Sequence, residues 1–110
     1  MDFPIPPLKP PYYAVTFSAR LTGIDMDEYS ELSNALLEKA QSLEGFLGEE
    51  ALRTNERGLT ISYWRDTDTI KAWMNDAEHI AARKIGKEKW YRSFVTRVAK
   101  VERDYDFTGD

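Results

Sequence analysis

The stretch Trp64–Gly86, WRDTDTIKAWMNDAEHIAARKIG, contains two of the three tryptophans of the chain and its only histidine. Ile70 and Trp73 have the spacing of one helical face, and the residues MND then interrupt this pattern. Asp76 is a favourable N-cap for a second helix, AEHIAARKI, which Gly86 can close. The stretch therefore predicts two consecutive short helices behind a strand that ends near Trp64.

The segment before this stretch begins with a strand and continues as a helix. Residues 12–21 alternate apolar and polar side chains, as a strand with one buried face does. Asp25 and Glu28 have the spacing of a capping box, and apolar residues then recur every three or four positions. Gly45 stands where a C′ glycine is expected. We therefore expect an amphipathic helix between residues 26 and 44.

Two further strands and their link form a predicted hairpin. GFLGEEALRT, residues 45–54, has a strand pattern that Gly48 weakens, and LTISYW, residues 59–64, alternates clearly. The residues NERG between them indicate a turn, in which Gly58 can adopt a positive φ. A last strand is expected over Phe94–Arg103.

The predicted element order is β-α-β-β-α-β, which is the ferredoxin-like topology of the α+β class. It gives a four-stranded antiparallel sheet with the helices on one face. The other face is left uncovered and carries alternating apolar side chains. Because an exposed apolar face indicates a binding partner, we expect a homodimer that pairs through its sheets.

The two ends of the chain differ from the domain between them. Residues 1–11 contain all five prolines and predict an extended arm. Pro7 and Pro10 fit a PxxP pattern, so the arm either docks a partner or lies over its own fold or a twin subunit. Residues 12–104 form the predicted domain, and residues 105–110 form an acidic tail.

Composition excludes several classes of protein. The chain has 110 residues, a net charge of −4 and no cysteine, which excludes disulfides and thiol nucleophiles. The acidic balance argues against nucleic-acid binding, and Leu59 and Ile61 replace the aromatic residues of an RNA-stacking strand. No apolar run is long enough to span a bilayer, so we expect no membrane association and a cytoplasmic location. No helix carries two histidines at metal-binding spacing, so no metal site is predicted.

Three motifs together resemble the antibiotic biosynthesis monooxygenase family. They are LEGFLGEE from Leu43, ISYWRDTDTIKAW from Ile61 and EHIAARKIGKEKWY from Glu78. The resemblance runs from about Tyr12 to about Asp104. It implies a dimeric α+β barrel, in agreement with pairing through the sheets. Members of this family either oxygenate phenolic compounds without a metal or organic cofactor, or bind and degrade haem.

The resemblance to the haem-degrading branch is incomplete. Resemblance to that branch implies three functional residues: an asparagine on the first strand, a tryptophan on the second helix and a histidine on the next helix. Trp73 matches the tryptophan, but the other two positions fall at Ser18 and Arg83. Arginine stays protonated and cannot replace imidazole as an iron ligand. Haem degradation is therefore the weaker alternative.

The first functional hypothesis is a cofactor-independent monooxygenase. Its substrate is a small aromatic, phenolic or enolisable compound that loses a proton and then reacts with dioxygen. His79 is the candidate base, because a helix N-terminus disfavours imidazolium and leaves the ring neutral. Arg83 or Ser18 is the candidate donor to an oxyanion, and Trp73 and Tyr63 are the candidate walls of the cavity.

The second hypothesis is a homodimer without enzymatic activity. It binds a small apolar ligand or a protein partner, with the proline-rich arm as the docking segment. In this interpretation His79 only caps or packs, and Trp73 is an ordinary core residue. Ligand-dependent oxygen uptake distinguishes the two hypotheses.

Overall fold

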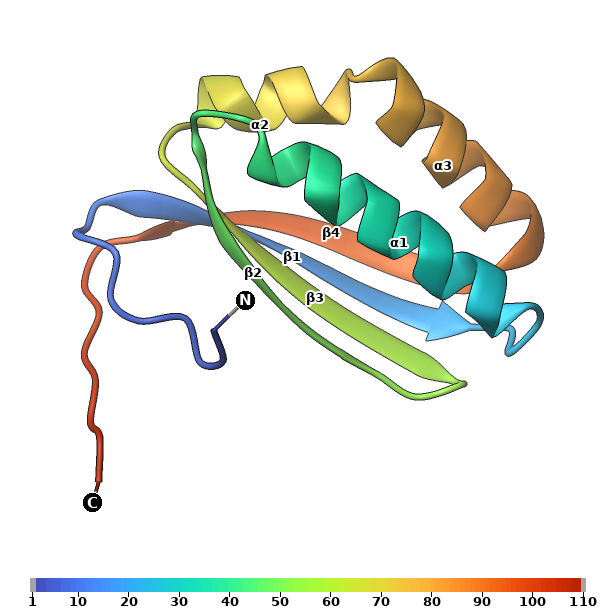
Figure 1. Cartoon of the computed structure of the whole chain (residues 1–110), viewed down its shortest axis with the longest axis horizontal. Coiled ribbons are helices and arrows are strands. Elements are labelled where there is room, and N and C mark those ends of the chain that lie inside the picture. The colour runs from blue at the N-terminus through green and yellow to red at the C-terminus, as the bar shows by residue number, and fades with distance from the viewer. Residues whose placement is uncertain (1, 110) are drawn as a thin grey trace.

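The computed structural model describes residues 2–109, which fold as one α+β domain with a short arm and tail (Figure 1). The strands and helices follow one another in the predicted order, including the two consecutive helices after the third strand. The elements are β1 (Tyr12–Leu21), α1 (Met26–Gln41), β2 (Phe46–Arg53), β3 (Arg57–Trp64), α2 (Thr67–Met74), α3 (Ala77–Lys89) and β4 (Tyr91–Val101).

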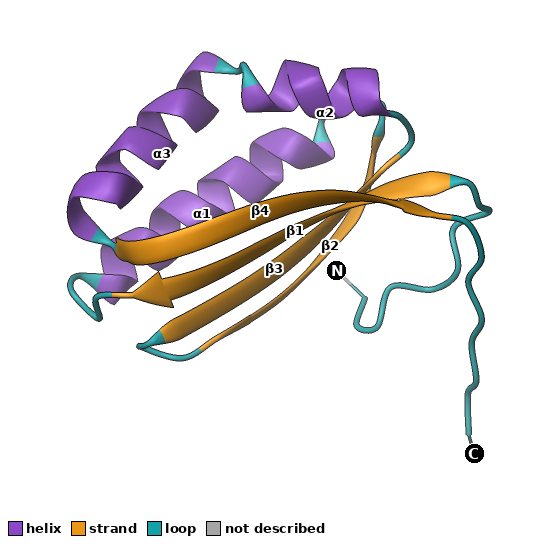
Figure 2. Ribbon diagram, turned by 180° about the vertical axis from the view of Figure 1, so that it is seen from behind, coloured by secondary structure: helices purple, strands orange, loops and turns teal. Residues whose placement is uncertain are grey.

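The four strands form one antiparallel sheet in the order β2-β3-β1-β4. All three helices lie on the same side of this sheet, and the arm and tail leave from its other side (Figure 2). We refer to these two sides as the helix face and the open face. The predicted ferredoxin-like fold is therefore confirmed.

The core lies between the sheet and the helices. Leu21, Tyr29 and Trp90 form a buried cluster where the N-terminal end of α1 meets the C-terminal end of α3. At the other end of the sheet, the side chain of Trp64 is 1% exposed and its indole Nε1 donates to Ser62 Oγ at 2.8 Å. The helices are thus anchored to the sheet by aromatic side chains at both ends.

The predicted capping box at the start of α1 is wrong. Asp25 is the N-cap, but its backbone is left-handed, with φ 50°, and its side chain makes no capping hydrogen bond. Asp25 and Glu28 instead pair with Lys89 Nζ, at 2.9 and 2.8 Å. The positive φ turns the carboxyl away from the helix amides, and the charge is used to join α1 to α3.

Three glycines have roles other than those the sequence predicted. Gly58 has no positive φ and lies within β3. Gly86 lies inside α3 instead of ending it, and a side chain there would meet the ring of Tyr91 that packs against it. Gly45 follows three residues of turn after α1, and its missing side chain leaves room for Thr69. Glycine is therefore required at Gly86 and Gly45 because another side chain approaches closely, and not because a helix ends there.

The arm lies against its own domain through a few polar contacts. The backbone amide of Ile5 donates to Glu50 Oε2 and that of Leu8 donates to Asp104 Oδ2, both at 2.9 Å. The hydroxyl of Tyr12 donates to the same Asp104 oxygen at 2.8 Å. The arm and the residues after β4 are therefore joined at one end of the open face.

The other end of the open face exposes apolar side chains. Leu52, Leu59 and Val95 are 65%, 44% and 48% exposed. The strand register places them side by side, because Leu59 lies opposite Leu52 and Ser18, and Ser18 lies opposite Val95.

Among residues 2–109, no helix is long and apolar enough to cross a bilayer.

Candidate functional site

A cavity of about 240 Å³ lies between the helix face of the sheet and the three helices. Every strand and every helix contributes to its lining, which is mostly aliphatic and aromatic. Side chains able to exchange protons or donate hydrogen bonds interrupt this lining at a few places. They include Glu49, Arg53, Ser62, His79, Arg83 and Thr96.

Aromatic rings form a continuous wall at one end of the cavity. The ring of Phe46 lies 5.1 Å from that of Trp64, which lies 6.3 Å from that of Trp73. The imidazole of His79 stacks on Trp73, with ring centroids 4.7 Å apart and an interplanar angle of 14°. The structure therefore places Trp73 and His79 side by side in this wall.

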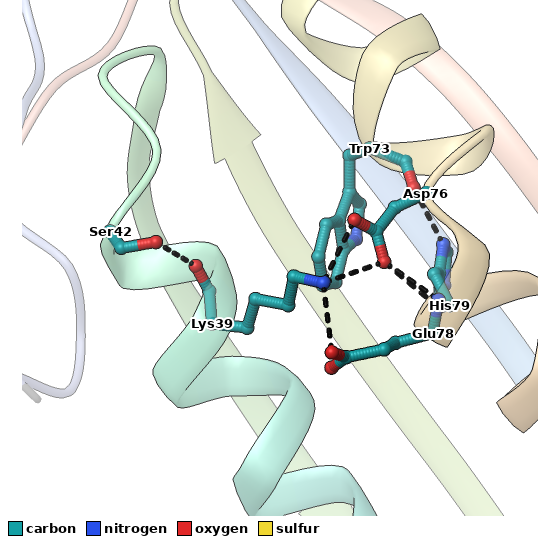
Figure 3. A network of polar contacts seen from close by, with 6 residues as sticks. All are labelled: Lys39, Ser42, Trp73, Asp76, Glu78 and His79. Atoms are coloured by element: carbon teal, nitrogen blue, oxygen red, sulfur yellow. Dashed lines mark hydrogen bonds and ion pairs between the residues drawn. The ribbon is translucent and has the colours of Figure 1, made fainter.

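The start of α3 holds His79 in place. The carboxylate of Asp76 caps the helix and accepts from the backbone amides of Glu78 and His79, at 3.0 and 3.2 Å. Lys39 reaches across from α1 and places its Nζ 3.0 Å from Asp76 Oδ2 and 3.3 Å from Glu78 Oε1 (Figure 3). The helix that carries His79 is thus tied to α1 at the edge of the cavity.

The hydrogen bond of His79 determines which ring nitrogen can accept a proton. Its Nδ1 lies 3.1 Å from the carbonyl oxygen of Trp73 (Figure 3). A carbonyl oxygen only accepts, so Nδ1 carries the hydrogen in the neutral ring and Nε2 keeps its lone pair. Burial lowers the pKa of His79, and the nearby charge of Arg83 lowers it further, against the opposing effect of the Trp73 carbonyl and Asp76. The ring is therefore a neutral proton acceptor.

Arg83 brings a positive charge to the same part of the cavity, one helical turn after His79. Its Nη2 donates to the carbonyl oxygen of Met74 at 2.9 Å, which fixes the side chain. Its Nε is buried without a hydrogen-bond partner in the structure of residues 2–109. The guanidinium thus retains capacity for an anionic partner.

Glu49 is a cavity residue that the sequence interpretation did not identify. It lies on β2 opposite Ser62, and both side chains line the cavity. Burial raises the pKa of the Glu49 carboxyl, and the charge of Arg53 lowers it to a smaller extent. The sequence contains one indication of this position: side chains alternate along a strand, so Glu49 lies on the same face as Ala51.

Ser18 and Tyr63 lie on the open face, away from this cavity. Ser18 borders a shallow groove with Leu59 and other residues of that face. The hydroxyl of Tyr63 donates to Glu50 Oε1 at 2.6 Å, and its ring packs edge-on against Tyr12. Adjacent residues of a strand point to opposite faces, so Ser18 is separated from the cavity although its neighbour Phe17 lines it.

In residues 2–109, no group of three or more histidine, aspartate or glutamate side chains could hold a metal ion. The cavity instead combines an aromatic wall, a neutral imidazole, a guanidinium and a carboxyl. This combination suits the binding of an aromatic or cyclic ligand and the removal of a proton from it.

Comparison with known proteins identifies the family. Residues 21–101 match the family model described as monooxygenase af470-like, which covers most of the domain. The chain belongs to the monooxygenase af470-like family. It is also 42% identical over 104 residues to the uncharacterised protein YqjZ of Bacillus subtilis, covering 94% of this chain and 90% of that protein.

A more distant relative has an activity in its name. The chain is 25% identical over 92 residues to the jasmonate monooxygenase ABM of Pyricularia oryzae. That match covers 81% of this chain but only 43% of the fungal protein. The chain therefore corresponds to less than half of that relative.

Solved structures of monooxygenases of this type have the same fold. A putative antibiotic biosynthesis monooxygenase from Nitrosomonas europaea superimposes with a TM-score of 0.74 at 10% identity, over 87% of this chain and 95% of that one. A mutant of SnoaB, a cofactor-independent oxygenase from Streptomyces nogalater, gives 0.74 at 10% identity over 86% and 97%. The resemblance to antibiotic biosynthesis monooxygenases that the sequence motifs indicated is confirmed.

Proposed function

We propose that this member of the family is a cofactor-independent monooxygenase that acts on a small aromatic, phenolic or enolisable compound. The observation that carries the proposal is the state of His79. Its hydrogen bond to the Trp73 carbonyl leaves Nε2 as the proton acceptor, and its lowered pKa keeps it neutral. It stacks in an aromatic cavity beside Arg83.

The reaction begins with removal of a proton from the substrate by His79 Nε2. Arg83 stabilises the oxyanion that forms, because a cation in a mainly apolar cavity interacts strongly with developing negative charge. The electron-rich anion then reacts directly with dioxygen. One substrate methylene and one dioxygen give one carbonyl group and one water, so the electrons balance without an added reductant.

The comparisons support an oxygenase activity but do not identify the substrate. SnoaB is described as a cofactor-independent oxygenase, and it shares the fold of this chain. The fungal relative is named a jasmonate monooxygenase, so a small cyclic substrate suits a protein of this family. Ser18 is not part of the proposed mechanism, since it lies on the open face, and Tyr63 is not a wall of the cavity.

The test is oxygen uptake with anthrone, a ketone that enolises readily. We expect uptake by the protein to exceed that of the buffer, and His79→Gln to lower it by about 10² to 10⁴-fold, the usual contribution of a general base. Lys84→Gln, a change on the exposed side of the same helix, is the control and should have no effect. If His79→Gln keeps full activity, the assignment of the base is wrong. Anthrone binding without uptake would favour the ligand-binding alternative.

The haem-degrading alternative does not fit the residues present. The position expected for the proximal histidine is Arg83, and Ser18, at the position of the asparagine, lies on the opposite face of the sheet from Trp73. Titration with haem should therefore give no histidine-type Soret band. Arg83→His should increase haem affinity. Tight binding by the unmodified protein that is lost in His79→Ala would reverse this conclusion.

We also propose that two copies pair through the open face. The support is the cluster of Leu52, Leu59 and Val95, which are exposed there side by side. Burying such a cluster against a second copy removes apolar area from water.

The cytoplasmic location stays a prediction of the sequence, as do the boundaries of the arm, domain and tail.

A further inference from the structure

We propose that the cavity selects ligands with two polar groups on opposite sides of an apolar ring system: an acidic oxygen that faces Arg83 and a hydroxyl that faces Glu49. The inference rests on the proposed function, because it names the class of compound that this site takes. It adds Glu49 as a specificity-determining residue.

The topology brings the two side chains to the cavity from opposite directions. Glu49 belongs to β2, which forms one edge of the sheet beneath α1, and Arg83 belongs to α3, which packs over β4 at the other edge (Figure 1). Both residues line the same cavity. A ligand between them is therefore approached by a carboxyl from one side and by a guanidinium from the other.

Each of the two groups has its own surroundings. The side chain of Arg83 donates to the backbone carbonyl of Met74, and the charge that lowers the pKa of Glu49 is that of Arg53 on its own strand. The lining of the cavity as a whole is mainly apolar, so charges in it are screened less than in water. An acidic oxygen complements the guanidinium, and a hydroxyl can donate to the carboxylate.

A hydroxyl also suits the Glu49 carboxyl better than an apolar group does. This carboxyl has a raised pKa because the surrounding protein excludes water. A ligand hydroxyl can donate a further hydrogen bond to the two-oxygen carboxyl group, whereas an apolar group at the same place cannot. The cavity of about 240 Å³ is smaller than the roughly 300–1,000 Å³ of typical ligand pockets, so it suits compact ligands of two or three fused rings.

Three naphthalene compounds test this selection by calorimetric titration. The first, 6-hydroxy-2-naphthoate, carries both polar groups; 2-naphthoate carries only the acid, and 2-naphthol carries only the hydroxyl. We expect 6-hydroxy-2-naphthoate to bind about tenfold more tightly than either of the others, since each charge-assisted hydrogen bond contributes about this factor. Equal affinities for the three compounds would overturn the proposal.

Substitutions then assign each preference to its residue. Arg83→Met should reduce the affinity for 6-hydroxy-2-naphthoate to that for 2-naphthol. Glu49→Met should reduce the affinity for 6-hydroxy-2-naphthoate to that for 2-naphthoate, and it should leave the affinity for 2-naphthoate unchanged. Glu49→Gln keeps the shape of the side chain, so its affinity for 6-hydroxy-2-naphthoate should lie between those of the parent and of Glu49→Met. Glu50→Met is the matched control, because Glu50 is the next residue of β2 and its side chain lies on the open face. If Glu49→Met weakens all three compounds equally, or Glu50→Met has the same effect as Glu49→Met, the proposal is wrong.

Failure of this inference and failure of the proposed function give different results. If the selection is absent while His79-dependent oxygen uptake persists, the oxygenase proposal stands and the role of Glu49 is wrong. If the selection is found but no enolisable compound causes oxygen uptake, the cavity is a ligand site of the stated class and the oxygenase proposal is wrong.

Discussion

The two faces of the sheet show how the same strand alternation can serve two purposes. On β1, Phe17 points to the helix face, where its ring lies 5.3 Å from that of Tyr91. The next residue, Ser18, points to the open face between Leu59 and Val95, which are about half exposed. The helices of the same chain cover the first face, whereas the second leaves apolar side chains exposed.

The helix face is covered but not filled. Its helices are held at their ends by aromatic clusters and by ion pairs such as Lys39–Asp76, and the cavity lies between these ends. The open face has a shallow groove at its exposed end. We therefore assign chemistry to the helix face and assembly to the open face, and the predictions below test this division.

The largest effect is expected from the buried wall of the cavity. Trp64→Ala removes a side chain that is 1% exposed and contacts both Phe46 and Trp73. It should lower the free energy of unfolding by about 3–5 kcal/mol, measured by urea denaturation. Leu52→Ala, at a side chain that is 65% exposed on the open face, should cost less than about 1 kcal/mol in a monomer. Similar losses for both variants would contradict the difference between the two faces.

The second prediction concerns pairing through the open face. Leu59→Glu places a charge in the exposed apolar cluster and should raise the dimer dissociation constant by at least about 30-fold, as loss of a hot spot of about 2 kcal/mol does. Sedimentation velocity over a concentration series measures this change. Ile85→Glu, at a residue of α3 with a similar exposed fraction of 42%, should leave the dimer intact. A parent protein that sediments only as a monomer at micromolar concentration would refute the pairing.

The third prediction concerns the end of the open face that the arm occupies. Tyr12→Phe removes the hydroxyl that donates to Asp104 and should lower the free energy of unfolding by about 1 kcal/mol. The burial of this hydroxyl and its bond to the Asp104 carboxylate raise the pKa of Tyr12 to about 12. Tyr105→Phe makes the same change at a residue that is 83% exposed and should have no measurable effect. Equal stability of the parent and both variants would show that the hydrogen bond between Tyr12 and Asp104 contributes nothing.

The smallest effect is the pH dependence that His79 contributes to stability. Its folded-state pKa lies below the ordinary value of 6.5, so the unfolded chain binds the proton more readily. The stabilisation that the neutral imidazole of His79 gives to the folded state is complete above pH 6.5. It is lost as the pH falls from 6.5 through the lower folded-state pKa of His79. Denaturation of the parent and of His79→Gln between pH 8 and pH 5 should show a smaller acid-induced loss in the variant. Parallel curves would indicate that the folded state does not hold the imidazole neutral.

The sequence by itself determined the fold and one end of the site. Period-two alternation placed residues 12–21 and 59–64 in strands, and helical spacing with the Asp76 cap placed His79 at the start of α3. These features were predictable because alternation, spacing and capping are local properties of the backbone. The expectation that Trp73 and His79 belong to one site came instead from the resemblance to the family.

Only the tertiary structure decided which residues share the cavity. The strand register and the position of the helices separate Ser18 and Tyr63 from it and bring Glu49 and Arg83 into its lining. Contacts between distant segments also turned Asp25 from a helix cap into a partner of Lys89. Such contacts depend on how layers pack, so a pattern of neighbouring residues does not contain them.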